Sequence, residues 1–220
     1  MSVRQLPLFP LPLVLFPGVP LPLHIFEPRY RELLADALAG DRCFGVLYRD
    51  EKGEDEPQRG HVGCIAHIEE TEELEDGRAN VLVAGTQRFR LERVVEASQR
   101  YQVGAVSTYA DLPESQERLA PLAARVRALF ERVGRAARTL ANDRDALPVL
   151  PDDPAMLSFA IASLIDLDAP ARQRMLVSRS ALGRLQTLDD LLAPAVDVIE
   201  MRASVHTRAK SNGHGPHPSP

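Results

Sequence analysis

The chain has 220 residues, of which 45% are hydrophobic and 26% charged, a balance typical of a globular protein with one sizeable domain or two small ones. The net charge of -5 argues against a general nucleic-acid or membrane-surface role, because both need clustered positive charge. No apolar run is long enough to span a membrane, and prolines interrupt the apolar N-terminus where a signal peptide would need a helix. We therefore expect a cytoplasmic protein, with Cys43 and Cys64 as reduced thiols.

The opening segment, residues 6–30, combines proline with large apolar side chains. Six prolines stand among thirteen large apolar residues before the first acidic residue, Glu27. Proline removes a backbone donor and blocks helix, so this segment should run extended, at a sheet edge or in a polyproline-like form. Its apolar side chains predict that it packs against a core.

The next part of the chain has the pattern of short strands. Asp76-Gly77 is a strong tight-turn signal between two of them. One early helix should begin after Glu27, which can cap it, with Pro28 in its first turn, and should end at Gly40. The expected strands are residues 43–48, 60–68, 80–91 and 101–109. Residues 1–112 should therefore form a curled, mostly antiparallel sheet or pseudo-barrel.

After Pro113 the pattern becomes helical, and we expect a helical bundle over residues 113–207. An apolar seam in steps of three and four predicts a first helix that packs on the chain's own later helices, with an intermolecular coiled coil as the alternative. Asp153-Pro154 and Asp168-x-Pro170 should start two further helices, and Pro194 should kink or divide the last one. Residues 208–220 should be a disordered tail. The seam consists of Leu119, Leu122, Val126, Leu129, Val133, Ala136 and Leu140.

A search for catalytic chemistry gives little. Neither glycine-rich phosphate loop, G-x-x-x-x-G-K-[ST] or G-x-G-x-x-G, occurs in the sequence. A serine-lysine dyad needs a desolvated lysine, yet Lys52 stands in an acidic loop and Lys210 in the tail. His61, Cys64 and His67 would be separated along and across one strand, which does not suit a metal site. We expect no catalytic residues, no cofactor and no metal.

The stretch from Gly85 to Arg90 allows two interpretations. Alternation along a strand places Arg88 and Arg90 on one face and Phe89 on the other. The structural interpretation is a strand with a glycine bulge and an inward phenylalanine. The functional interpretation makes the two arginines the rim of a binding groove.

In combination, several segments resemble the Lon protease N-terminal domain, also called the Lon substrate-binding domain. They are LPLFPLPLVLFPGVPLPLHIFEPRYREL, RCFGVL, VGCIAHIEE, the DGR turn and GTQRFRL, in this order and spacing, and later DDPAMLSFAIASLIDLDAPARQRML. The resemblance covers roughly residues 5–192. It implies an α+β fold: a PUA-like sheet followed by a helical bundle, here without the ATPase and peptidase modules of full-length Lon.

The resemblance also implies a function. We expect a non-enzymatic module that binds unfolded or apolar polypeptide segments, as an adaptor or regulator of proteolysis, with a protease as a potential partner. It places polypeptide contact at Phe26, Glu27, Arg29 and Tyr30, to which Arg88 and Arg90 are added from the strand pattern. RNA binding, known for PUA-like sheets, is the alternative, and the acidic balance weighs against it.

Overall fold

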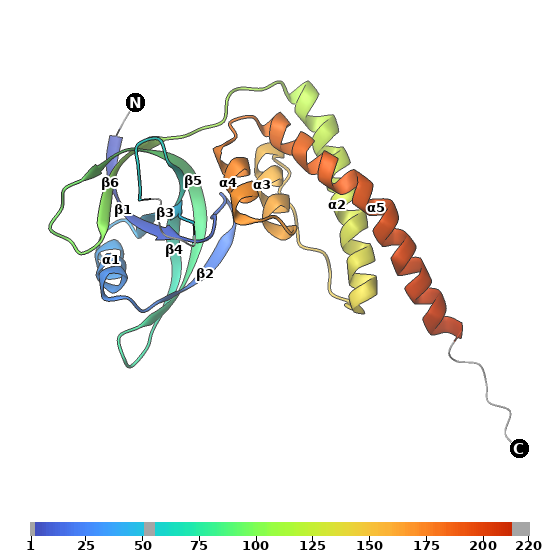
Figure 1. The fold of residues 1–220 in the computed structure, drawn as a ribbon, viewed down its shortest axis with the longest axis horizontal. Coiled ribbons are helices and arrows are strands. Elements are labelled where there is room, and N and C mark those ends of the chain that lie inside the picture. Colours follow the sequence, from blue (N-terminus) through green and yellow to red (C-terminus); the bar gives the residue numbers. More distant parts are fainter. Residues whose placement is uncertain (1–2, 51–55, 213–220) are drawn as a thin grey trace, which may run out of the picture. The chain divides into compact units, whose positions relative to one another are not determined.

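The structure is a computed structural model that describes residues 3–50 and 56–212. Its elements follow in the order two strands, one helix, four strands and four helices (Figure 1). The strands are β1 (Val3–Leu11), β2 (Pro20–Ile25), β3 (Cys43–Tyr48), β4 (Val62–Glu73), β5 (Ala79–Val95) and β6 (Gln102–Thr108). The helices are α1 (Pro28–Ala39), α2 (Gln116–Ala141), α3 (Pro154–Leu164), α4 (Ala169–Val177) and α5 (Ala181–Asn212). No helix in the described ranges is long and apolar enough to cross a bilayer.

The six strands form one sheet that closes on itself. Their order is β2-β5-β4-β3-β1-β6, and a further pairing of β5 with β6 completes a ring of five strands. All pairings are antiparallel except that of β1 with β3. The expected α+β fold with a curled, mostly antiparallel sheet is confirmed.

Strand β1 shows how prolines fit inside a closed sheet. The strand pairs with β6 over Val3–Leu8 and with β3 over Leu8–Leu11, so most of its residues have one neighbouring strand rather than two. Pro7 lies in the first part and Pro10 in the second. A missing N–H is tolerated where one side of a strand is unpaired. The opening segment is thus extended, as expected, although β1 lies within the ring and not at its edge.

Strand β5 carries the predicted glycine bulge. Between Cys64 and Ala66 on β4, the partner strand advances from Arg88 to Gly85, which inserts one extra residue on β5. A Cβ atom at position 85 would clash with the carbonyl oxygen of Phe16. Glycine is therefore required there, because the proline-rich segment crosses β5 at this point. Phe89 points into the core, as the structural interpretation expected.

The chain divides into two compact units, and α4 belongs to the one with the sheet. The sheet unit comprises residues 1–113 and 162–180, and the helical unit residues 114–161 and 181–220. The side chain of Gln173 donates to the carbonyl of Val62 at 2.9 Å, and the Tyr109 hydroxyl donates to the carbonyl of Val177 at 3.0 Å. One boundary between the units follows Pro113, and the helical half of the chain is interrupted by residues 162–180, which belong to the sheet unit.

In the helical unit α2 and α5 run side by side (Figure 1), which confirms that the seam of α2 packs on the chain's own later helix. Arg132 pairs with Glu200 at 2.8 Å between these helices. Asp153 caps α3 at the N–H of Met156, as predicted. Pro194 does not divide α5, which continues to Asn212, so residues 208–212 are helical where a tail was expected. The remainder of that tail lies outside the described residues.

Candidate functional site

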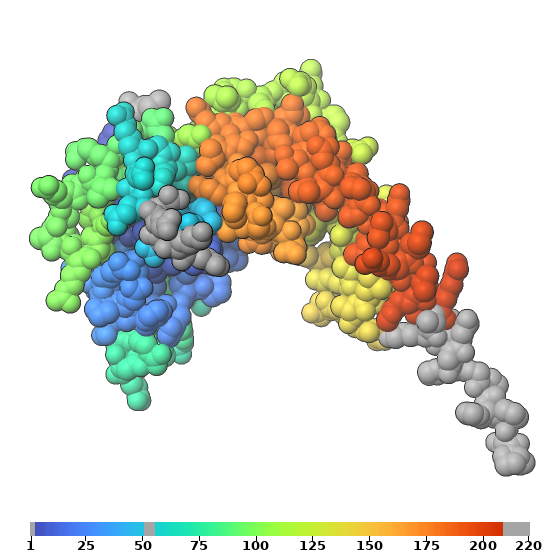
Figure 2. Space-filling model, viewed as in Figure 1, coloured from blue at the N-terminus to red at the C-terminus, as the bar shows by residue number. Residues whose placement is uncertain are grey.

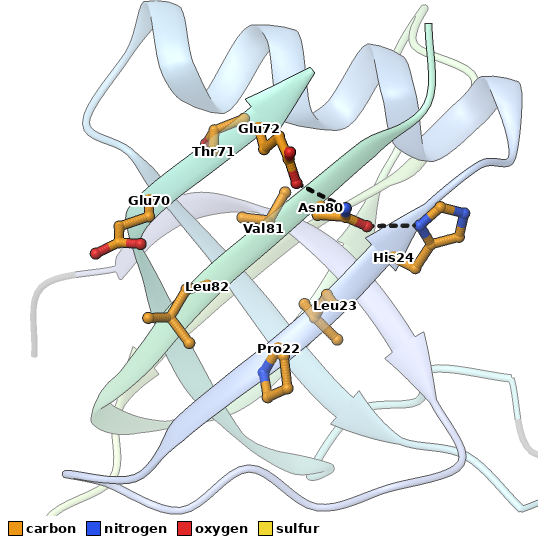
Figure 3. Close-up of a pocket in the computed structure, with 9 residues that line it drawn as sticks. All are labelled: Pro22, Leu23, His24, Glu70, Thr71, Glu72, Asn80, Val81 and Leu82. Carbon is orange, nitrogen blue, oxygen red and sulfur yellow. Dashed lines mark hydrogen bonds between the residues drawn. The ribbon is translucent and has the colours of Figure 1, made fainter. Parts of the chain in front are cut away.

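A hollow of about 450 Å³ opens on the outward face of β2, β5 and β4 (Figure 3). Side chains alternate along these strands, so Val81 and Val83 enter the core while Asn80 and Leu82 turn outward. We call the outward set the β2 face. It comprises Pro22, His24, Phe26, Glu70, Glu72, Asn80 and Leu82.

One row of the β2 face is polar. Strand register aligns Glu72, Asn80 and His24 across the three strands. The Asn80 amide nitrogen donates to Glu72 at 2.9 Å, which leaves its oxygen to accept from His24 Nδ1, also at 2.9 Å (Figure 3). Nδ1 therefore carries a proton, and the row is held by its own hydrogen bonds.

The neighbouring row is apolar and ends in an acid. Here Pro22, Leu82 and Glu70 are in register, two residues further along the strands. Phe26, just beyond the end of β2, stacks on His24 with 6.1 Å between ring centroids and is 58% exposed. An aromatic ring left in water at the border of a hollow that contains an apolar row marks a surface that is able to bind a partner.

The open edge of β2 cannot act as a full template for an added strand. The N–H of Gly85 donates to the carbonyl of Val19. The backbone N–H and C=O groups of odd-numbered residues in this segment therefore point toward β5, and those of even-numbered residues point toward the open edge. The even positions within β2 are Pro20, Pro22 and His24, and two of them have no N–H. The edge therefore offers carbonyls but one donor, which disfavours the strand addition by which many sheets bind peptides.

The structure separates the residues that the resemblance placed at a binding surface. Glu27 is not a side-chain cap of α1; it pairs with Arg29 at 2.8 Å, and both are about half exposed. Tyr30 is 6% exposed and packs on Phe9 with ring centroids 4.1 Å apart. Burial raises the pKa of the Tyr30 hydroxyl. Phe26, Glu27 and Arg29 are thus at least partly exposed, whereas Tyr30 is a core residue of the sheet unit.

The two strand arginines occupy different surroundings. Arg88 is 5% exposed, and its guanidinium donates to the carbonyls of Leu176 and Ser178, each at 2.7 Å, and to Asp111. Arg90 pairs with Glu92 at the surface. Arg88 holds α4 to the sheet, so the two arginines do not form an exposed pair, and neither lies on the β2 face.

Cys43 and Cys64 are free thiols. Burial raises the pKa of the Cys64 thiol to about 12, and burial followed by the charge of Asp41 raises that of Cys43. Within residues 3–50 and 56–212, no three histidine, cysteine or acidic side chains are placed to hold a metal ion.

Comparison with known proteins decides the family. The family described as the ATP-dependent protease La (LON) substrate-binding domain matches residues 5–193. The chain belongs to this family. It is 30% identical over 213 residues to Lon protease 2 of Herpetosiphon aurantiacus and 25% identical over 222 residues to the Lon protease of Cytophaga hutchinsonii. It covers 26% of each relative, so it spans about a quarter of their length.

Two solved structures share the fold. The Lon N-terminal domain protein from Xanthomonas campestris is 28% identical, with a TM-score of 0.61 over 84% of this chain and 96% of that one. The N-terminal domain of the Mycobacterium avium complex Lon protease has a TM-score of 0.65 over 86% of this chain and 98% of that one, at 18% identity. The matched region is the part of Lon named for substrate binding, and this supports a substrate-binding role for the chain.

The site contains residues that the sequence left unassigned. The structure places His24, Glu70 and Glu72 on the β2 face, and all three are exposed. The signal that could have located the face is the alternation of Pro20 and Pro22 with leucine, because it marks an unpaired strand side.

Proposed function

We propose that this Lon substrate-binding domain binds extended, unfolded polypeptide through the β2 face and carries out no catalysis itself. The observations that carry the proposal are the hollow over the apolar row of Pro22 and Leu82 and the exposed Phe26 ring, which stacks on His24 at the border of that hollow. An unfolded segment offers apolar side chains that a folded protein hides. The β2 face can cover one or two of them at a time, which gives weak and reversible binding.

The mode of binding follows from the shortage of backbone N–H donors at the open edge of β2. Since Pro20 and Pro22 remove two donors, a client is held mainly by its side chains over the hollow and less by backbone pairing. Such binding tolerates many sequences, because the apolar row makes no demand on backbone register. In a proteolytic system the domain would deliver clients to a protease or compete for them.

The RNA-binding alternative gains no support from this surface. Glu70 and Glu72 line the hollow, and the nearby cation Arg78 pairs with Asp76 at 2.5 Å. A phosphate backbone requires unpaired positive charge, whereas this face is acidic. The polypeptide proposal is therefore the one that we test.

The test is a titration of a fluorescein-labelled, permanently denatured client protein, followed by anisotropy, against wild type and Phe26→Ser. Removing about 60 Å² of ring from the contact at about 25 cal/mol per Å² gives about 1.5 kcal/mol, or about tenfold in Kd. Val94→Ser is the matched control, because Val94 is an exposed apolar residue at the other end of β5.

We expect binding without ATP, about tenfold weaker for Phe26→Ser and unchanged for Val94→Ser, with equal melting temperatures for all three proteins. A client that binds all three proteins equally well would contradict the placement on the β2 face. A client that binds none of them would contradict the function itself.

A further inference from the structure

The acidic side chains of the β2 face are of two kinds. Glu72 is engaged by Asn80 in the polar row. Glu70 is exposed, and within the part of the chain that the structure describes its carboxylate has no hydrogen bond or ion pair. Figure 3 shows the Glu70 carboxylate extending outward beside Leu82, at the border of the hollow. A negative charge thus lies directly next to the apolar row.

The surroundings do not neutralise this charge. The turn that joins β4 to β5 adds Glu73, Glu75 and Asp76, and it protrudes from the sheet unit in the space-filling view (Figure 2). Arg78 is paired with Asp76, and Arg31 packs against Gly77 at the same turn. Two arginines face a larger number of carboxylates, so the potential over the hollow is negative.

The spacing of the rows matches that of an extended peptide. Glu70, Leu82 and Pro22 lie in register on adjacent strands, and adjacent strands are about 4.8 Å apart. The midpoint between Leu82 and Pro22 therefore lies about 7 Å from Glu70, measured across the strands. Side chains i and i+2 of an extended peptide project to one side at about 6.6 Å. A peptide laid across the strands can thus place one side chain on Leu82 and Pro22 and the next on the same side at Glu70.

We infer that the β2 face selects polypeptide segments in which an aromatic or large apolar residue stands two positions from a lysine or arginine. The apolar side chain covers Leu82 and Pro22, and the ammonium or guanidinium pairs with Glu70. This inference rests on the proposed function and assigns the class of client. Acidic segments are disfavoured at the same place, because a client carboxylate would face Glu70.

The experiment uses short Gly/Ser host peptides that carry a labelled end and the core Phe-Ser-Lys, Phe-Ser-Gln or Phe-Ser-Glu, together with the reversed orders. Each is titrated against wild type, Glu70→Gln and the matched control Glu96→Gln. Glu96 is an exposed glutamate just past the far end of β5, and its replacement changes the net charge equally. Titrations at about 10 mM and about 1 M salt change the Debye length from about 30 Å to about 3 Å.

For wild type we expect the lysine peptide to bind about two- to fivefold more tightly than the glutamine peptide, and the glutamate peptide to bind most weakly. Glu70→Gln and high salt should each remove the lysine preference, and Glu96→Gln should keep it. Equal binding of the three peptides overturns the charge preference and leaves the proposed function standing. A preference retained in Glu70→Gln overturns the assignment to Glu70. Failure of all peptides and of the denatured client overturns the proposed function.

Discussion

Replacing Arg88 with methionine should detach α4 from the sheet. The guanidinium is almost fully buried and donates to two carbonyls, those of Leu176 and Ser178, and to the Asp111 carboxylate. Methionine fills most of the volume but supplies no donor. The carbonyls then lose charge-assisted bonds worth about 1.5–3 kcal/mol each, and Asp111 is left without this cation.

The net loss is smaller than the sum of those bonds, because burying the charged guanidinium is itself costly. Breaking one side of a buried ion pair costs about 3–5 kcal/mol, and we expect the free energy of unfolding of the sheet unit to fall by that amount for Arg88→Met. At about 2–4 °C per kcal/mol for a chain of this size, the melting temperature should fall by about 6–20 °C.

Urea denaturation followed by circular dichroism measures the loss. Limited trypsin digestion locates it, because Arg172 and Arg174 lie in α4 and should be cut first in the variant. Arg90→Met is the control: its pair with Glu92 is solvent-exposed, so the urea midpoint should barely move. If Arg88→Met unfolds at the midpoint of Arg90→Met and α4 stays resistant to trypsin, the role assigned to Arg88 is wrong.

Two further predictions concern titratable groups. Burial raises the pKa of Cys64 to about 12, so a disulfide reagent at about pH 8 should label Cys43 alone in the folded protein. In urea the reagent should label both thiols. Equal labelling rates in the folded protein would contradict the burial of Cys64. A hydrogen bond from Arg132 lowers the pKa of Glu200 below 4.5, so the pair stabilises the fold above that pH and its contribution disappears as pH falls through the lowered value. Calorimetry should therefore show a melting-temperature gap between wild type and Glu200→Gln at neutral pH that closes in acid, whereas a constant gap would exclude this linkage.

Local signals in the sequence were sufficient for most elements. Asp153 and Asp168 were expected to start helices, and each accepts a hydrogen bond from a backbone N–H three residues later. The bulge at Gly85 and the inward Phe89 were also expected, because a glycine inside a strand pattern and alternation are readable over a few residues. These features depend on residues that are close together in the chain, so they can be predicted from a single sequence.

The features that sequence reasoning missed depend on distant partners. Arg88 and Arg90 look equivalent in an alternating strand, yet Arg88 meets carbonyls 88 and 90 residues further along the chain. Tyr30 has the pattern of an exposed helix start, but Phe9 from β1 covers its ring. The hollow forms only when β2 pairs with β5 and β5 pairs with β4 in the observed registers, and these pairings could not be predicted from the sequence. Of the residues that the sequence predicted for polypeptide contact, Phe26 lies on the β2 face, and that contact stays a prediction.

The prolines of the opening segment connect fold and function. Pro7 and Pro10 stand in β1 where the strand has one neighbour, and Pro20 and Pro22 stand on the open side of β2. In each case an absent donor removes a place where a foreign strand could pair. Under the proposed function, a domain that binds unfolded chains would be exposed to such pairing, which would trap a client in the sheet. Binding by side chains on a face, beside an edge from which proline removes donors, would keep the capture of a client reversible.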